Sequence, residues 1–266
     1  MKRICLSSVL VLAGVPASAD PIFDTFGPFP NATFGGTGIP NDSVAASTQI
    51  VDGDNLITVA LSSTQRFNLP AVIPDPLQDG VYIAQPGVDD IGGTQLLGSE
   101  WNFNFYVEVR SISGANDPSI TDYNFDLLYD FDAGVDTPFS SLGRIDYDIA
   151  APAATISTFE DFADGEIAQG SQNLLFGFLG TSFSVDGFGT PVPPGTPGSI
   201  PVIEAPSATY DPFAAGEYSF AIGVSTVGGF PLESVAIDVV VVPEPGVATL
   251  AGLGALGLMA RRRRTA

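Results

Sequence analysis

Apolar and polar side chains alternate along several stretches of this chain, and this period of two constrains its fold more than any other feature. The odd positions of residues 101–110 are all apolar, and those of residues 123–131 are all aromatic or aliphatic. Successive side chains of a β-strand point to opposite faces, so both runs predict strands with one buried face. A Ser-Gly-Ala-Asn-Asp-Pro segment separates them. We therefore expect an antiparallel pair with its aromatic face inward and an acidic face outward.

A second pair of alternating runs ends at residue 241. Residues 218–224 and 235–241 flank a turn sequence at 227–231, which predicts a terminal hairpin. Just before it, residues 216–220 resemble the tyrosine corner of immunoglobulin-like sandwiches, with Phe220 at the position of the second cysteine of antibody domains. Weaker patterns predict further strands at residues 50–61, 80–83, 141–149, 173–187 and 199–204.

The fold class follows from these patterns. Residues 20–242 show little helical periodicity, and their content of aromatic residues, Gly and Pro is typical of an ordered β protein. We expect an all-β fold, a single β-sandwich of the immunoglobulin-like or jelly-roll type. Residues 187–206 are rich in Pro and Gly, and we interpret them as a long loop within one domain, with two sub-domains as the alternative.

The first nineteen residues have the pattern of a secretory signal peptide. Lys2 and Arg3 precede an apolar stretch over residues 4–15, and Ala17 and Ala19 supply the small residues of a cleavage site. We expect export by the Sec translocon and a mature chain that starts at Asp20.

Residues 243–266 form an ordered triplet of a Pro-Glu-Pro tripeptide, an apolar stretch over residues 247–260 and an arginine block. Its motif residues are Pro243, Glu244 and Pro245, followed at the far end by Arg261, Arg262, Arg263 and Arg264. Fourteen helical residues rise about 21 Å, which is short for a bilayer core of about 30 Å. The arginines can snorkel to the interface and hold that end in the cytoplasm, so we expect a short transmembrane helix with the preceding domain outside.

This triplet resembles the PEP-CTERM sorting signal of Gram-negative bacteria that make exopolysaccharides. The resemblance implies recognition of Pro243, Glu244 and Pro245 by an exosortase, a membrane protease that removes the anchor as the protein passes from the inner membrane to the cell surface or matrix. Parts of residues 20–242, which we call the body, resemble uncharacterised proteins of the same class, which have no known activity. These parts are residues 101–106, 123–131, 167–174 and 210–213.

Charge sets the partners that the body can have. Of nine basic residues, two lie in the signal and four in the tail, which leaves Arg66, Arg110 and Arg144 against twenty-nine acids and a net charge of −26 for residues 20–242. Such a surface repels nucleic acid. The same residues contain no His, Cys or Lys, which excludes a Ser-His-Asp triad, a Cys nucleophile and a zinc site with His or Cys ligands. Only carboxylate chemistry remains, as in glycosidases.

One acidic turn has the spacing of a cation site. Asp130, Asp132 and Asp136 place oxygen ligands at relative positions 1, 3 and 7, which could hold Ca²⁺. The stretch departs from the EF-hand pattern, because Val135 stands where that loop needs Gly. The alternative is a solvated acidic turn. Residues 52–55, Asp-Gly-Asp-Asn, are a second candidate, for which a hairpin turn is the favoured interpretation.

We therefore expect a non-enzymatic surface or matrix protein, associated with exopolysaccharide or biofilm and without a cofactor other than possible Ca²⁺. One alternative is a glycan-binding module, which could be Ca²⁺-dependent and would use exposed aromatic rings. Trp101 is expected in the core, and the tyrosines less firmly tied to a core are Tyr82, Tyr106, Tyr147 and Tyr210. The other alternative is a carboxylate-based glycoside hydrolase.

Overall fold

The computed structural model describes residues 21–30, 32–34, 43–66, 71–89, 98–135, 137–146 and 167–243. Within these ranges the chain is all-β, as expected, and its only helical turns are the short 3-10 segments η1 (Ile120–Asp122) and η2 (Phe139–Ser141). No helix in this part of the chain is long and apolar enough to cross a membrane. The predicted signal peptide and the predicted tail helix lie outside the described residues.

Five strands form the first sheet, in the order β1-β2-β3-β8-β11, and all its neighbours are antiparallel. Their bounds are β1 (Thr25–Pro28), β2 (Val44–Asp52), β3 (Asn55–Gln65), β8 (Trp101–Ser111) and β11 (Ile167–Gln172). The strands β6 (Val88–Asp89) and β7 (Gly98–Ser99) make a separate short pair.

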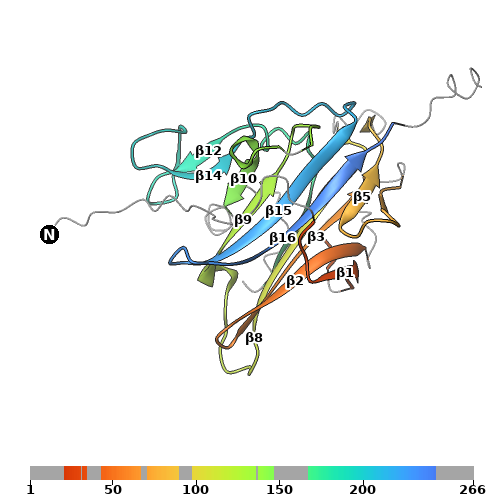
Figure 1. Ribbon diagram of the computed structural model, residues 1–266. Coiled ribbons are helices and arrows are strands. Elements are labelled where there is room, and N and C mark those ends of the chain that lie inside the picture. The colour runs from red at the N-terminus through yellow and green to blue at the C-terminus, as the bar shows by residue number, and fades with distance from the viewer. Residues whose placement is uncertain are drawn as a thin grey trace, which may run out of the picture.

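The second sheet has nine strands in the order β13-β12-β14-β10-β9-β15-β16-β5-β4. Its neighbours are antiparallel except for β16 and β5, which run parallel. Figure 1 shows β15 and β16 running side by side across the molecule. The bounds are β4 (Ile73–Pro74), β5 (Val81–Ala84), β9 (Tyr123–Tyr129), β10 (Gly143–Asp146), β12 (Phe183–Val185), β13 (Pro191–Val192), β14 (Ile200–Glu204), β15 (Gly216–Thr226) and β16 (Pro231–Val241).

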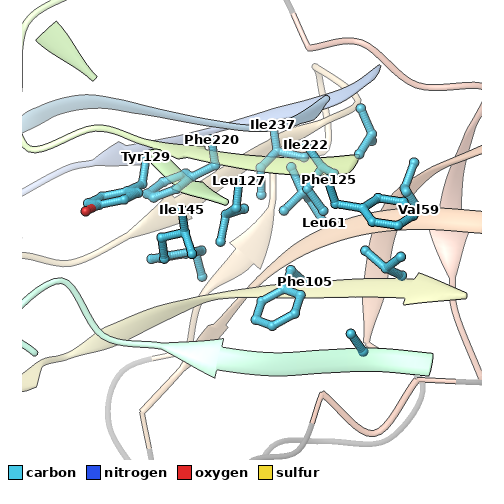
Figure 2. Packing of buried hydrophobic residues seen from close by; sticks show 14 of the residues in the cluster. Val59, Leu61, Phe105, Phe125, Leu127, Tyr129, Ile145, Phe220, Ile222 and Ile237 are labelled. Carbon is cyan, nitrogen blue, oxygen red and sulfur yellow. The ribbon is translucent and has the colours of Figure 1, made fainter. Parts of the chain in front are cut away.

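The two sheets share one apolar core, which is consistent with the expected sandwich. Figure 2 shows Phe105 of the first sheet facing Leu127 and Phe220 of the second. Rings stack across the gap, since the Phe103 and Phe220 centroids lie 4.6 Å apart. Trp101 is 1% exposed and packs against Phe220 at 6.0 Å, so its predicted place in the core is confirmed.

One predicted pairing is wrong. Residues 101–110 and 123–131 do form strands, β8 and β9, but β8 pairs with β3 and β11, whereas β9 pairs with β10 and β15. The chain between them crosses from one sheet to the other, so the two aromatic faces meet across the core. Alternation of apolar and polar residues indicates only that one face of a strand is buried. Two strands show the same alternation whether they are hydrogen-bonded in one sheet or pack across the core from opposite sheets.

Both predicted hairpins are confirmed. β15 pairs with β16 as the predicted terminal hairpin, and Phe220 lies opposite Ile237. β2 and β3 form the other hairpin around Gly53, whose φ of 61° is the left-handed value that a tight turn needs. Residues 173–182, in contrast, form successive turns where a strand was predicted.

Part of the outer face of the five-stranded sheet is covered by the N-terminal segment. Phe34, Ala60 and Tyr106 are buried in a small second cluster, and Phe29 packs against it. Gln169 on the edge strand β11 accepts hydrogen bonds from the backbone N–H groups of Thr33 and Phe34, which holds the N-terminal segment over the sheet. The polar outer face predicted for residues 101–110 is therefore partly interior.

Candidate functional site

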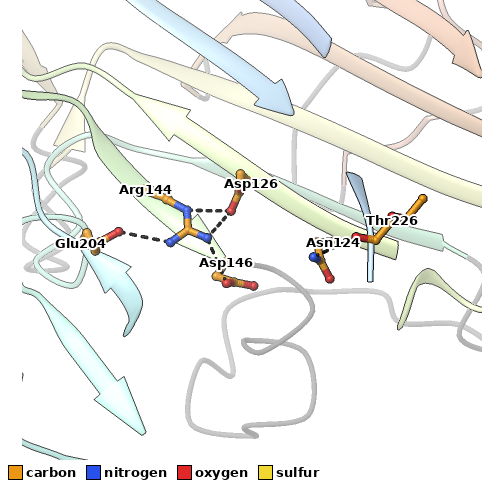
Figure 3. Close-up of polar contacts among 6 residues, drawn as sticks. All are labelled: Asn124, Asp126, Arg144, Asp146, Glu204 and Thr226. Atoms are coloured by element: carbon orange, nitrogen blue, oxygen red, sulfur yellow. Dashed lines mark hydrogen bonds and ion pairs between the residues drawn. The ribbon is translucent and has the colours of Figure 1, made fainter. Parts of the chain in front are cut away.

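Arg144 is surrounded by three carboxylates from three strands, as Figure 3 shows. Its Nε donates to Asp126 Oδ1 at 2.7 Å, and its Nη2 lies 2.6 Å from the same oxygen. Nη2 also reaches Asp146 Oδ2 at 3.1 Å, and Nη1 reaches Glu204 Oε2 at 3.2 Å. We call these four residues the Arg144 cluster.

Strand geometry assembles the cluster. Arg144 and Asp146 are two residues apart on β10, so both side chains leave the same face of the sheet. Directly across the neighbouring strands, Arg144 lies opposite Glu204 on β14, and Asp146 lies opposite Asp126 on β9. Opposite-charge pairs at such positions stabilise a sheet, whereas the like charges of Asp126 and Asp146 would repel without the arginine.

Burial and charge compete at this cluster. Burial raises the pKa of Asp126, and Arg144 opposes that rise. Burial would lower the pKa of Arg144, but the attraction of Asp126 and Glu204 outweighs it and raises that pKa. The guanidinium therefore stays charged at neutral pH. Asp146 Oδ1 is buried without a hydrogen-bond partner among the described residues.

A cavity of about 460 Å³ opens beside the cluster. Arg144 and Glu204 form one part of its wall, and apolar and hydroxyl side chains form the rest. Its volume lies within the range of small-molecule sites. Its lining includes Phe139, Ser140, Arg144, Ser184, Pro194 and Glu204.

This cluster was not predicted from the sequence. The available signal was that Arg144 is one of only three arginines in residues 20–242 and stands two residues before Asp146. Glu204 follows it by sixty residues, and no sequence pattern links them.

The predicted cation turn is only partly described. Asp130 is 1% exposed and accepts a hydrogen bond from the N–H of Asp132, whose own Oδ1 accepts the N–H of Gly134. Burial raises the pKa of the Asp130 carboxyl. Asp136 lies outside the described residues, and the described acids alone form no group of three that could hold a metal ion. The turn-forming role of Asp130 and Asp132 is clear, and the Ca²⁺ site stays a prediction.

The other acidic turn, residues 52–55, is the hairpin turn that was favoured. The Asp54 carboxylate accepts hydrogen bonds from the hydroxyls of Ser111 and Ser113, both at 2.7 Å, and from Asn116. The serine hydroxyls lower the pKa of Asp54, which keeps it ionised. Its oxygens fasten the loop after β8 to the hairpin.

The sorting motif begins where the last strand stops. β16 ends at Val241, and the N–H of Val242 still donates to the carbonyl of Ala84 at 2.9 Å. Pro243 follows and is exposed. The remaining predicted residues of the signals lie outside the described ranges, namely Ala17, Ala19, Glu244, Pro245, Arg261, Arg262, Arg263 and Arg264.

Three of the four tyrosines suggested for sugar stacking are buried. Tyr82 and Tyr106 are 1% exposed and Tyr210 is 8% exposed, so all three belong to the interior. Tyr147 lies outside the described residues. The local sequence pattern did not place these three tyrosines in the core, but packing against other parts of the chain buries them.

Comparison with known proteins adds no identification, because no protein family, no curated protein and no solved structure matches the chain.

Proposed function

We propose that this chain is an exported, non-enzymatic surface or matrix protein that an exosortase-type protease processes at Pro243, Glu244 and Pro245. The observation that supports this most is the position of Pro243. It is exposed and directly follows a strand that is hydrogen-bonded up to Val242. Proline cannot extend a strand ladder, so the motif starts where the ladder of β16 ends, and we expect an enzyme to reach it there.

Processing there would leave the domain intact. β16 lies between β15 and β5, and its pairings end with Val241 opposite Gly216 and Ala84. A cut after Val242 therefore removes no described strand residue. The released body would keep its charge of −26, which favours solubility and suits an extracellular polymer with divalent counter-ions.

For the fold we propose the immunoglobulin-like type rather than the jelly roll. Tyr218 lies two residues before Phe220, and its hydroxyl is 3.4 Å from the carbonyls of Asp211 and Ala214 upstream. This is the back-bonding of a tyrosine corner. Trp101 packs against Tyr218 and Phe220, where the tryptophan of antibody domains packs against a disulfide.

The test of sorting is replacement of Pro243, Glu244 and Pro245 by alanine in the native host. We expect the variant to keep its tail and stay in the membrane fraction, detected as a larger species by immunoblot and mass spectrometry. The matched control replaces Pro193 and Pro197, two exposed prolines of the β13–β14 loop, and should be processed like the wild type. Normal processing of the Pro-Glu-Pro variant would refute the proposal.

A second candidate function, glycan binding, is favoured by the cavity beside the Arg144 cluster. Arg144 and Glu204 present planar polar groups, Ser184 adds a hydroxyl, and Phe139, 39% exposed, offers a ring edge or face. Fixed polar groups beside an apolar surface are what a sugar with vicinal hydroxyls requires.

A glycan array on the purified protein tests this function. Any glycan that binds should lose affinity on Glu204→Gln, and Glu233→Gln at an exposed site on β16 should leave binding unchanged. Equal binding by both variants would place the glycan elsewhere.

A further inference from the structure

The described part of the chain stops at one defined end of the domain, which we call the exit. β16 runs toward that end, where Val241 pairs with Gly216 and the N–H of Val242 donates to Ala84. The turn between β15 and β16, with Phe230, lies at the opposite end of the same strands.

Three exposed apolar side chains lie on segments next to this exit. Phe213 is 68% exposed, Val135 is 70% exposed and Val242 is 46% exposed. Backbone contacts bring their segments together, because Glu217 N–H donates to Ala133 at 3.3 Å and Gly87 N–H donates to Pro212 at 2.8 Å. We call Val135, Phe213 and Val242 the exit patch.

The segments that carry the patch are held in place by the fold. Phe213 N–H donates to Asp211 Oδ1 at 3.0 Å, and Ala214 N–H donates to the Asp211 carbonyl at 3.1 Å. Beneath them, Tyr210 packs against Phe131 and Trp101, with centroids 5.7 and 6.5 Å away. Phe213 is therefore presented outward by a turn that is anchored on the core.

The sequence places the membrane close to this end, an argument that rests on the proposed sorting tail. From Val242 to the first residue of the apolar stretch, Val247, there are five residue steps. A fully extended chain spans at most about 3.5 Å per residue, so the tether reaches about 17 Å. The end of the domain that carries the exit must therefore lie next to the bilayer while the tail is anchored.

We propose that the exit patch rests on the lipid surface of that bilayer before processing, with Phe213 as its main contact. Burying exposed apolar side chains at the interface is favourable, and the tether supplies a high local concentration of lipid. The acidic domain would be repelled by anionic lipids, so the contact is apolar and needs no anionic headgroup. Contact with the membrane would hold the start of the sorting motif near the interface, where a membrane protease works.

The experiment uses the unprocessed chain of residues 20–266, which has no cysteine, reconstituted into phosphatidylcholine vesicles. A nitroxide label is attached to Phe213→Cys, to Val135→Cys or to the control Phe230→Cys. Phe230 is 73% exposed at the far end of β16, so it matches Phe213 in residue type and exposure. Collisions with oxygen and with a neutral, water-soluble nickel reagent then report lipid contact without interference from the charge of the domain.

We expect flotation with the vesicles, and several-fold fewer nickel collisions at 213 and 135 than at 230. Flotation with equal accessibility at all three positions would overturn the exit-patch proposal and leave the sorting proposal standing. Failure to float would overturn both, because the tail would then provide no anchor. Val135→Cys keeps the test valid if the label at 213 disturbs its turn.

Discussion

Arg144→Met should destabilise the protein strongly at neutral pH. The substitution keeps most of the side-chain volume and removes the positive charge that faces Asp126, Asp146 and Glu204. Removing one partner of a fully buried ion pair costs about 3–5 kcal/mol. The Arg144 side chain is 29% exposed and that of Asp126 is 6% exposed, so water screens part of the effect. We expect a loss of about 3 kcal/mol, at the lower end of that range.

The loss should depend on pH with a definite sign. Burial already raises the pKa of Asp126, and Arg144 is the influence that opposes it. Without Arg144 that pKa rises further, so the folded variant takes up a proton at a higher pH than the unfolded chain does. A raised folded-state pKa gives stability that is present at low pH and is lost as the pH rises. The difference from wild type should therefore be largest at neutral pH and smaller near pH 4.5.

Urea unfolding followed by the fluorescence of Trp101 measures both effects, because Trp101 is the only tryptophan and is buried. Arg110→Met, at an exposed position of β8, is the matched control and should cost less than about 0.5 kcal/mol. Adding Asp126→Asn to Arg144→Met should restore part of the stability. A loss for Arg144→Met as small as that of the control, or one that does not change with pH, would refute this account.

Two further predictions concern buried and acidic residues. Asn173 is fully buried, and its amide donates to the carbonyls of Ser99 and Trp101 and accepts from Ser99 N–H. The Asn173→Asp substitution would place a carboxylate oxygen against those two carbonyls. We expect it to lower the free energy of unfolding, measured in urea, by about 2–4 kcal/mol. If Asp130, Asp132 and Asp136 bind Ca²⁺, adding millimolar CaCl₂ should raise the melting temperature. Asp132→Asn should reduce that rise, and the absence of any rise in the wild-type protein would identify the turn as acidic surface only.

The same alternation led to one confirmed hairpin and one wrong pairing. β15 and β16 were paired correctly because only four residues join two runs of matching length. β8 and β9 show equally clear alternation, but the longer segment between them, including η1, has room to cross to the other sheet. A short loop forces two strands to pair in one sheet. A longer loop can also carry the chain to the other sheet, and its length alone does not decide which of the two happens.

Burial of the tyrosines was decided in the same way by long-range packing. Tyr106 lies on the outer face of β8, where alternation predicts solvent. It is buried because Phe29 and Phe34 from a distant segment cover that face. Nothing within residues 101–110 carries this information.

The sequence by itself determined the all-β class, most of the long strands and which of their faces carry the apolar residues. These depend on the period of side chains along a single strand, which is a local property. Only the tertiary structure decided which strands are neighbours, and therefore that Arg144 meets Glu204 sixty residues away and that β5 lies parallel to β16 up to the residue before Pro243. Such contacts depend on the path of the connecting segments and on how two sheets bury their apolar faces against each other. The alternation of side chains along one strand contains no information about either.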